Sequence, residues 1–177
     1  MTYLIATVLT FLTNITPHPA CEAAAVRLTA YSEAVQVARV TICSLVVNQA
    51  EQRGLPPALV AELSWAESRW TLHAENTRTK CWGPLQVQPY FWCPDKKKGG
   101  CDPVKAGLDA LATYLALYPK SQEEAICHFQ AGNTCTPGGR RGAKRVLHMT
   151  ARLKARLAER VPKPVAILDL KRWGQGT

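Results

Sequence analysis

The 177-residue sequence predicts one all-α domain, or a mainly α domain with a minimal β-hairpin. Apolar residues recur in several segments at the three- and four-residue spacing of a helix. No stretch of any length alternates apolar and polar residues as a half-buried strand does. Glycine, proline and N-capping residues separate the helical segments, and the length is that of a single domain with its own core.

The N-terminal third begins with an apolar run and continues into a long helical segment. The run, "YLIATVLTFL", has the length of a signal peptide and is shorter than a membrane span needs. We therefore expect residues 1–21 to be a signal peptide or an N-terminal anchor. A lipidated Cys21 and a buried first helix stay open as alternatives. An Ala- and Val-rich helix is expected from about Glu22 to Gln52, with Gly54 at its C-terminal cap.

The middle of the chain predicts two further helices on either side of a loop region. "GLPPALVAELSWAESRW" begins a helix with proline in its first turn, where the missing N–H costs nothing. Residues 71–101 are rich in Trp, Gly, Pro and Lys, and are expected to be a loop region. The next helix follows Asp102, which we interpret as its N-cap, with Pro103 at the first helical position.

Capping residues also mark the helices of the C-terminal third. Ser121 and Glu124 predict a capping box for "SQEEAICHFQ", and Gly132 closes that helix. "PGGRRG" is expected to be a flexible basic loop. The last helix is expected over about residues 143–159, and residues 162–177 are expected to form a flexible tail. The folded domain is thus expected to span residues 22–161.

Seven cysteines predict a disulfide framework in an oxidising compartment. Cys93 and Cys101 bracket one short loop, and Cys127 and Cys135 bracket another. Cys81 with Cys127 is a rival pairing. No CxxC motif occurs and the four histidines are scattered, so we expect no metal site and no cofactor.

The formal net charge of +9 favours anionic partners: nucleic acid, an anionic membrane surface or an acidic wall polymer. A solvated basic face is an equally good interpretation. "GGRRGAKR" would suit a basic helical nucleic-acid-binding domain, but the cysteines and the apolar N-terminal run argue against that class. We therefore expect no nucleic-acid partner, and a membrane partner only if the N-terminal segment is uncleaved.

Glu67 is the residue that departs from the helical pattern. At about 100° per residue it lies in an apolar stripe, whereas Glu62 projects from the flank near Arg69 and is expected to be solvated. Desolvation of a carboxyl group raises its pKa, which makes Glu67 a candidate general acid. Cleavage of a glycosidic bond needs such a group. The alternative is a helix end at which the stripe simply stops. The other residues of the stripe are Leu59, Val60, Leu63, Ala66 and Trp70.

A second carboxylate usually assists the general acid of a glycosidase. None of the candidates has the placement that marks Glu67, and Asp102 is better explained as a helix cap. The candidates are Glu75, Asp95, Asp102 and Asp109.

Three sequence blocks, within about residues 45–160, resemble the catalytic domain of soluble lytic transglycosylases, which are relatives of goose-type lysozyme. In "GLPPALVAELSWAESRW" the family's acid/base falls on Glu67 and its serine on Ser68. "GPLQVQP" resembles the family's Gly-x-x-Gln-x-x-Pro turn and supplies Gln86. "AICHFQAGN" resembles the Ala-x-x-x-Tyr-Asn-Ala-Gly motif, with Phe129 and Gln130 at the Tyr-Asn positions.

The resemblance implies a lysozyme-like helical fold and a lytic transglycosylase activity. Such an enzyme cleaves the MurNAc–GlcNAc β-1,4 bond of peptidoglycan and forms 1,6-anhydro-MurNAc. It implies an exported protein of the periplasm or cell envelope, or of a phage virion, that opens local gaps for a secretion or conjugation apparatus or a phage. A hydrolytic goose-type lysozyme and a non-catalytic peptidoglycan-binding module are the alternatives.

The resemblance also assigns substrate-binding roles. The amides of Gln86 and Gln130 suit N-acetyl or hydroxyl groups, and loop-fixing hydrogen bonds are an equally good interpretation. Ser68 is expected either to serve the surroundings of Glu67 or to brace the helix end. One of four aromatic residues is expected to stack on sugar rings: Trp82, Tyr90, Phe91 or Trp92.

Two departures from the family pattern weaken the expected site. Phe129 lacks the hydroxyl of the family's tyrosine, and a second family tyrosine falls near Gly142. Tyr114 and Tyr118, on another helix, are candidates to replace these hydroxyls.

Overall fold

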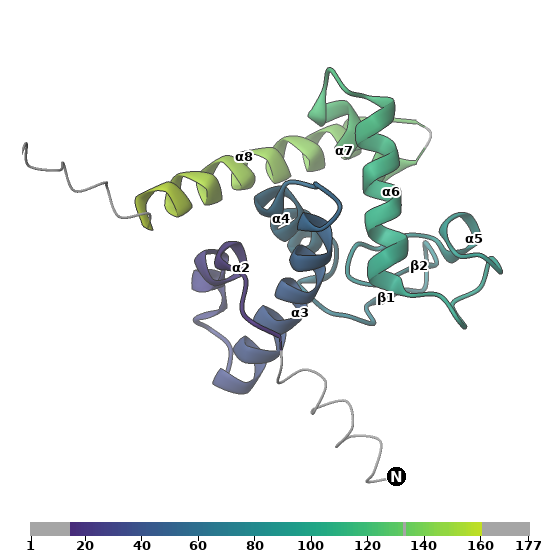
Figure 1. The fold of residues 1–177 in the computed structure, drawn as a ribbon. Coiled ribbons are helices and arrows are strands. Elements are labelled where there is room, and N and C mark those ends of the chain that lie inside the picture. The colour runs from purple at the N-terminus through teal and green to yellow at the C-terminus, as the bar shows by residue number, and fades with distance from the viewer. Residues whose placement is uncertain (1–14, 133, 161–177) are drawn as a thin grey trace, which may run out of the picture.

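The computed structural model describes residues 15–132 and 134–160 of the chain. Within them, helices enclose a central helix and a single hairpin lies at one side (Figure 1). The prediction of a mainly α fold with a minimal β-hairpin is confirmed. The elements in order are α2 (Pro19–Ala24), the 3₁₀ helix η1 (Ala25–Leu28), α3 (Glu33–Glu51), α4 (Pro57–Ser68), β1 (Glu75–Asn76), β2 (Cys81–Trp82), α5 (Pro89–Trp92), α6 (Pro103–Leu117), α7 (Gln122–Ala131) and α8 (Pro137–Arg160).

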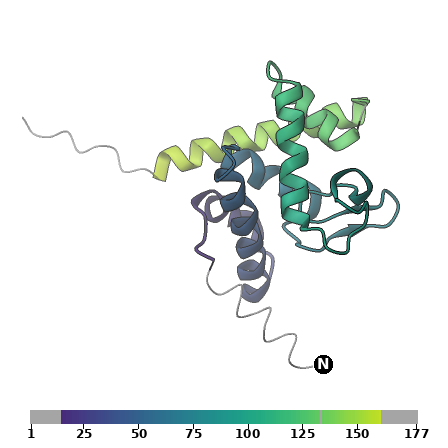
Figure 2. The ribbon, with the colours of Figure 1, turned by 45° about the vertical axis from the view of Figure 1, so that its right-hand side comes forward.

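Helix α4 forms the centre of the fold. Every residue from Ala58 to Ser64 is buried, so the helix has no solvent-facing stripe in its first two turns. It packs against α2, α3 and α8. Figures 1 and 2 show that α8 lies across α2 and α4. Helix α5 and the hairpin lie near α6, at the opposite side of the molecule from α2. The core therefore surrounds the helix that carries Glu67.

The N-terminal third differs from the expected single helix. The chain forms α2 and η1, turns, and then begins α3 at Glu33. A disulfide between Cys21 and Cys43 joins α2 to α3 and holds the chain folded back on itself. Helical periodicity could not show this break, because the turn depends on a link between residues 22 positions apart.

The folded region begins earlier than the expected boundary at residue 22. Ala20 and Cys21 are fully buried, and the ring of His18 caps α2 by accepting a hydrogen bond from the Ala20 N–H. The Cys21 sulfur is engaged in the disulfide, so it is not free for lipidation. Residues 1–14 of the expected signal peptide or anchor, and the expected tail at 162–177, lie outside the described residues.

Three disulfides join six of the seven cysteines. The predicted pairs Cys93–Cys101 and Cys127–Cys135 are confirmed, and Cys21–Cys43 is an addition. Cys81 is free, so its rival pairing with Cys127 is wrong. Three disulfides indicate an oxidising environment. Among the described helices, none is long and apolar enough to cross a membrane.

The predicted N-caps of α6 and α7 are present, but the capping box of α7 is only half formed, because the Ser121 N–H donates to the Tyr118 carbonyl. The Asp102 carboxylate accepts hydrogen bonds from two backbone N–H groups of the first turn of α6, and Ser121 accepts one from the Glu124 N–H. Gly132 ends α7 with φ 74°, a conformation that favours glycine.

Helix α8 begins six residues before the expected start, so "PGGRRG" is helical and not a flexible loop. The Thr136 hydroxyl accepts a hydrogen bond from the Gly139 N–H at 3.1 Å, and Pro137 suits a first helical position. A Cβ at Gly139 would lie 2.9 Å from the Ala131 Cβ. The glycine therefore lets α8 approach α7 closely, which outweighs its low helix propensity.

Candidate active site

A cleft of about 530 Å³ opens beside α7. Its lining comes from four places in the chain: residues 79–88 around the hairpin, α5, α6 and residues 129–132 at the end of α7. The cleft therefore gathers the second and third of the sequence blocks, whose glutamines Gln86 and Gln130 are 44 positions apart in the printed sequence.

Glu67 is not among the residues that line this cleft, but it contacts one of them. Gln130, near the end of α7, lines the cleft, and its Nε2 donates a hydrogen bond to Glu67 Oε1 at 2.7 Å. Glu67 as a residue is partly exposed, but burial of its carboxyl group raises the pKa above the ordinary value, and the Gln130 hydrogen bond lowers it by a smaller amount. A carboxyl group in this setting retains its proton to higher pH than an exposed one does.

The end of α4 fixes where Glu67 lies. Arg69 and Trp70 both have positive φ, 58° and 57°, which ends the helix within two residues of Ser68. Trp70 is fully buried and its Nε1 donates to the Ala61 carbonyl at 2.9 Å. The Ser68 hydroxyl donates to the Ser64 carbonyl and accepts from the Thr71 N–H. Ser68 thus braces the helix end, the second of its two expected roles.

Glu62 is buried, so the expectation that it is solvated is wrong. Its side chain is 2% exposed, and both carboxylate oxygens accept from the Arg27 guanidinium at 2.8 and 2.5 Å. The guanidinium also lies over the rings of Trp65 and Trp70, at 5.1 and 5.6 Å from their centroids. Arg27 comes from η1, 35 residues away, and no local pattern indicated it. Ala66, expected in the apolar stripe, is exposed.

Gln86 lies on the cleft wall and also fixes its own loop. Its Nε2 donates to the carbonyls of Ala74 and Gly83, at 2.9 and 2.8 Å. Gly83 has φ 85°, and a Cβ there would lie 2.7 Å from the Pro103 Cβ. The Gly-x-x-Gln turn thus packs directly on the start of α6, and the Gln86 amide holds its shape.

The expected aromatic residues lie in three settings: the core, the cleft wall and, for Tyr90, exposed surface outside the cleft lining. Trp82 is 8% exposed and belongs to a small core cluster beneath α6. Tyr90 and Phe91, on α5, are 59% and 68% exposed and pack edge to face. Phe91 and Trp92 line the cleft. The sequence pattern of this loop region does not indicate which of its aromatic residues are buried and which are exposed.

Tyr114 and Tyr118, the candidates to replace the missing hydroxyls, lie in different places. Tyr114 lines the cleft and packs edge to face on Phe129, with ring centroids 6.3 Å apart. Tyr118 stacks on His128 at 4.5 Å and serves the α6–α7 connection. Tyr114 therefore places a hydroxyl-bearing ring beside the position at which Phe129 lacks one.

Gly142, at the second departure from the family pattern, lies against Gln130. A Cβ at Gly142 would be 2.6 Å from the Gln130 Oε1. This oxygen is buried and has no hydrogen-bond partner among the described residues. Gly142 thus leaves room for the amide that holds Glu67.

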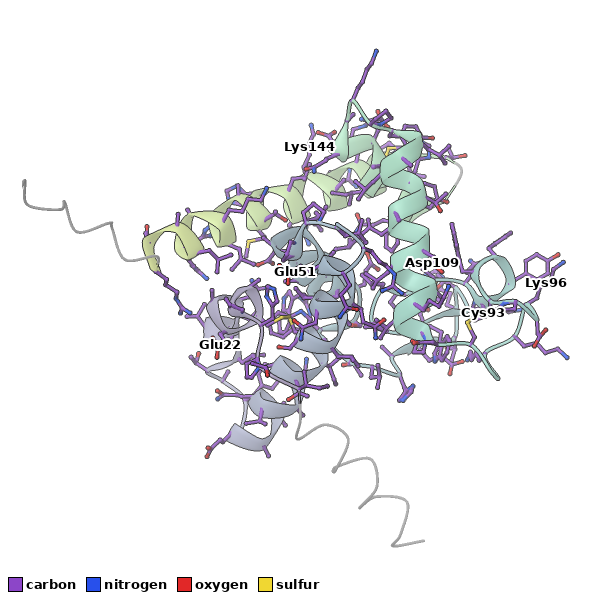
Figure 3. The ribbon with its side chains drawn as sticks, viewed as in Figure 1. Glu22, Glu51, Cys93, Lys96, Asp109 and Lys144 are labelled. Atoms are coloured by element: carbon purple, nitrogen blue, oxygen red, sulfur yellow. A yellow bond between two sulfur atoms is a disulfide. The ribbon has the colours of Figure 1, made fainter. Side chains whose placement is uncertain are left out.

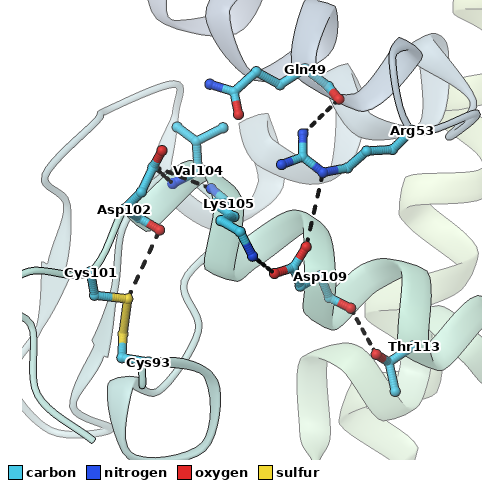
Figure 4. A network of polar contacts seen from close by, with 9 residues as sticks. All are labelled: Gln49, Arg53, Cys93, Cys101, Asp102, Val104, Lys105, Asp109 and Thr113. Atoms are coloured by element: carbon cyan, nitrogen blue, oxygen red, sulfur yellow. Dashed lines mark hydrogen bonds and ion pairs between the residues drawn. A yellow bond between two sulfur atoms is a disulfide. The ribbon is translucent and has the colours of Figure 1, made fainter. Parts of the chain in front are cut away.

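The other candidate carboxylates have different partners. Asp109 pairs with Lys105 at 2.6 Å and with Arg53 at 3.9 Å (Figure 4). Glu75 pairs with Lys98, and Asp102 caps α6. Asp95 is exposed on the loop closed by the Cys93–Cys101 disulfide. Figure 3 shows this loop with Cys93 and Lys96 labelled. In the described part of the chain, no three His, Cys, Asp or Glu side chains gather as metal ligands.

Comparisons with protein-family models, with curated proteins and with solved structures find no match to this chain.

Proposed function

We propose that this chain is a peptidoglycan-cleaving enzyme of the lytic transglycosylase type, acting in the periplasm or cell envelope. One observation carries the proposal: the Glu67 carboxyl group has a raised pKa and is held at 2.7 Å by Gln130, a residue that lines a cleft of about 530 Å³. A carboxylic acid that retains its proton can transfer it to a leaving glycosidic oxygen. The three sequence blocks add the substrate class.

In the proposed reaction one carboxyl group acts twice. Protonated Glu67 gives its proton to the oxygen between N-acetylmuramic acid and N-acetylglucosamine, and the C1–O bond breaks. The resulting carboxylate takes the proton of the muramyl C6 hydroxyl, whose oxygen bonds to C1 and closes the 1,6-anhydro ring. No water is consumed, and no second carboxylate is required. The partners of Glu75, Asp102 and Asp109 are consistent with this single-acid scheme.

Residues of the cleft would position the acid and the substrate in this reaction. Gln130 holds the Glu67 carboxyl group in place. When that carboxyl group is ionised, the amide N–H of Gln130 stabilises its negative charge. Phe91, Trp92 and Tyr114 line the cleft with aromatic surface on which sugar rings pack. Gln86 keeps the facing turn in shape.

The test is the release of soluble muropeptides from purified sacculi by the oxidised protein and by Glu67→Gln. We expect release by the wild type and a loss of at least about 100-fold in the variant, the lower end of the contribution of one general acid. Glu33→Gln is the matched control, because Glu33 is exposed at the start of α3 and its change leaves the cleft intact. Equal release by all three proteins would contradict the assignment of Glu67.

A non-catalytic peptidoglycan-binding module is the second candidate. Phe129 and Gly142 favour it, because neither supplies the hydroxyl that the family pattern places near the acid. This module would sediment with sacculi and release nothing, and Glu67→Gln would leave the binding unchanged.

The biological setting is proposed from the resemblance. Small enzymes of this type open local gaps in the cell wall for a secretion or conjugation apparatus, or for a phage particle. The disulfides are consistent with such an exported location.

A further inference from the structure

Helix α8 carries a large excess of positive over negative charge. Its 24 residues contain eight Lys or Arg and one Glu, a formal excess of seven positive charges, whereas the whole chain has a net charge of +9. Charge that serves only solubility has no reason to gather on one helix. The helix also has no acidic residue in its first turn, where acidic residues stabilise a helix.

Four of these arginines form a row together with a histidine, and we call this row the basic ridge: Arg141, Arg145, His148, Arg152 and Arg156. Their spacing of three or four residues places them on one face of the helix. The opposite face is the buried one, with Ala143, Val146, Thr150 and Leu153 in the core. At 1.5 Å per residue the ridge is about 22 Å long.

Four of the five ridge side chains are exposed, and Arg156 is half-buried. Figures 1 and 2 show α2 and α4 on the inner side of α8 and no described element over its outer side. Among the described residues, Arg140 and Lys144 pair with Glu123 or Glu124 of α7, but the four ridge arginines form no ion pair. Lys144, next to the ridge, also points away from the body of the protein (Figure 3).

Like charges at this spacing destabilise a helix, so the ridge opposes the stability of α8 in isolation. An opposing anionic surface removes that repulsion. Arginine is well suited to the contact, because its planar guanidinium binds phosphate oxygens with two hydrogen bonds.

The chemistry of the ridge selects among anionic partners. No large apolar side chain of α8 is exposed, so the face lacks the apolar centre of a protein–protein interface and the aromatic rings on which single-stranded bases stack. The ridge is convex, whereas a polymer strand is held in a groove. A straight convex ridge can touch a flat surface along its whole length. Lipid headgroups diffuse within the surface, so they can meet the ridge arginines whatever the spacing between those arginines.

We propose that the basic ridge binds an anionic lipid surface through its phosphate groups, without inserting side chains into the bilayer. The binding is electrostatic and is screened by salt. It is independent of the chemistry proposed at Glu67.

The test is flotation of the full chain with vesicles of phosphatidylglycerol and phosphatidylcholine, and with vesicles of phosphatidylcholine alone. The second arm measures any adsorption through the apolar run in residues 1–14. Arg145→Gln with Arg152→Gln removes two ridge charges, and Lys97→Gln with Lys120→Gln removes two exposed charges elsewhere. Thermal unfolding of each variant checks that it is folded.

We expect salt-sensitive binding only to the anionic vesicles. The ridge variant, Arg145→Gln with Arg152→Gln, should lower the partition coefficient on the order of 30-fold. The control variant, Lys97→Gln with Lys120→Gln, should lower it only a few-fold. Equal losses in both variants would show that net charge alone acts. Absence of binding to the anionic vesicles would overturn the proposal. So would a ridge variant that loses binding to duplex DNA or to sacculi while its vesicle binding is unchanged.

Discussion

Gln130 holds the Glu67 carboxyl group and partly offsets the rise of its pKa. Its Nε2 donates to Glu67 Oε1 at 2.7 Å, and this bond favours the ionised carboxylate. The remaining, larger influence is burial, which raises the pKa. Two opposed effects at one carboxyl group give a direct way to test the site by its pH dependence.

Gln130→Ala should move the falling limb of the pH–rate profile to higher pH. Removal of the hydrogen bond leaves burial unopposed, so the pKa of Glu67 rises and the acid keeps its proton to higher pH. The rate itself should fall on the order of 10- to 100-fold, because the carboxyl group loses its orientation. The measurement is muropeptide release from sacculi across a pH series.

Gln88→Ala is the matched control for this change. Gln88 also lines the cleft, but its Nε2 donates to the Thr79 carbonyl and not to Glu67. Its removal should leave the pH limb in place. A limb that moves to lower pH in Gln130→Ala would contradict the assigned role of the amide.

Gly142→Ala should separate stability from activity. Alanine favours the interior of α8 by about 0.5–1 kcal/mol over glycine. Its Cβ would meet Gln130 Oε1 at 2.6 Å and push the amide away from Glu67. We expect an unfolding temperature that is unchanged or higher, together with an activity about tenfold lower.

Gly138→Ala provides the comparison on the same helix. The nearest atom to a Cβ at Gly138 is the Thr136 hydroxyl at 3.7 Å, which is an ordinary contact. This variant should retain full activity. An active Gly142→Ala enzyme would show that the packing of Gln130 against α8 does not matter for the site.

At the scale of elements, the Arg27–Glu62 ion pair joins η1 to the helix that carries Glu67. It is bidentate and nearly excluded from solvent. Arg27→Met should lower the free energy of unfolding by about 3–5 kcal/mol, because Glu62 is left as an uncompensated buried charge. Chemical denaturation of the variant and the wild type measures this difference.

The double variant Arg27→Met/Glu62→Leu tests the cause of that loss. Replacing both partners removes the unpaired charge, and such exchanges are often neutral or stabilising. The double variant should therefore recover most of the stability. A double variant as unstable as the single one would mean that packing of the Arg27 side chain, and not the buried charge, accounts for the loss.

The sequence predicts elements well where local chemistry determines them. Asp102, Ser121 and Gly132 are terminal signals that act within a few residues, and the helices they bound were expected correctly. The failures involve partners far along the chain. The break after α2 depends on Cys43, the burial of Glu62 depends on Arg27, and the early start of α8 depends on a glycine packed against α7.

The same distinction holds within the site. Glu67 is marked by an apolar stripe on its own helix, which the printed sequence shows directly. Its contact with Gln130, 63 residues away, is a tertiary contact, and the separation of Phe91 from Trp82 is decided by packing on α6. Periodicity contains no information on either.

At the scale of the whole molecule, the disulfides fix the N-terminal fold and two sides of the cleft. Cys93–Cys101 closes the chain just after the cleft-lining α5, and Cys127–Cys135 spans the cleft-lining end of α7. Cys21–Cys43 instead lies in the core between α2 and α3. The three bridges should therefore differ in what they protect.

Removal of Cys21–Cys43 by alanine should cost about 3.4 kcal/mol of stability from loop entropy, and removal of Cys93–Cys101 about 2.6 kcal/mol. Only the second should weaken sacculus binding, since it frees α5 and with it Phe91. Thermal unfolding and sacculus sedimentation measure the two effects. Loss of sacculus binding in the Cys21–Cys43 variant alone, at a temperature where it is folded, would contradict this division.

The most direct test of the central claim is the mass of the muropeptides that the oxidised protein releases from sacculi. The account predicts products that are one water molecule lighter than hydrolytic ones, with a 1,6-anhydro muramyl end, and their absence with Glu67→Gln. Products with a reducing end would keep Glu67 as the acid but contradict the internal attack by the C6 hydroxyl. Anhydro products that persist in Glu67→Gln would contradict the account at its centre.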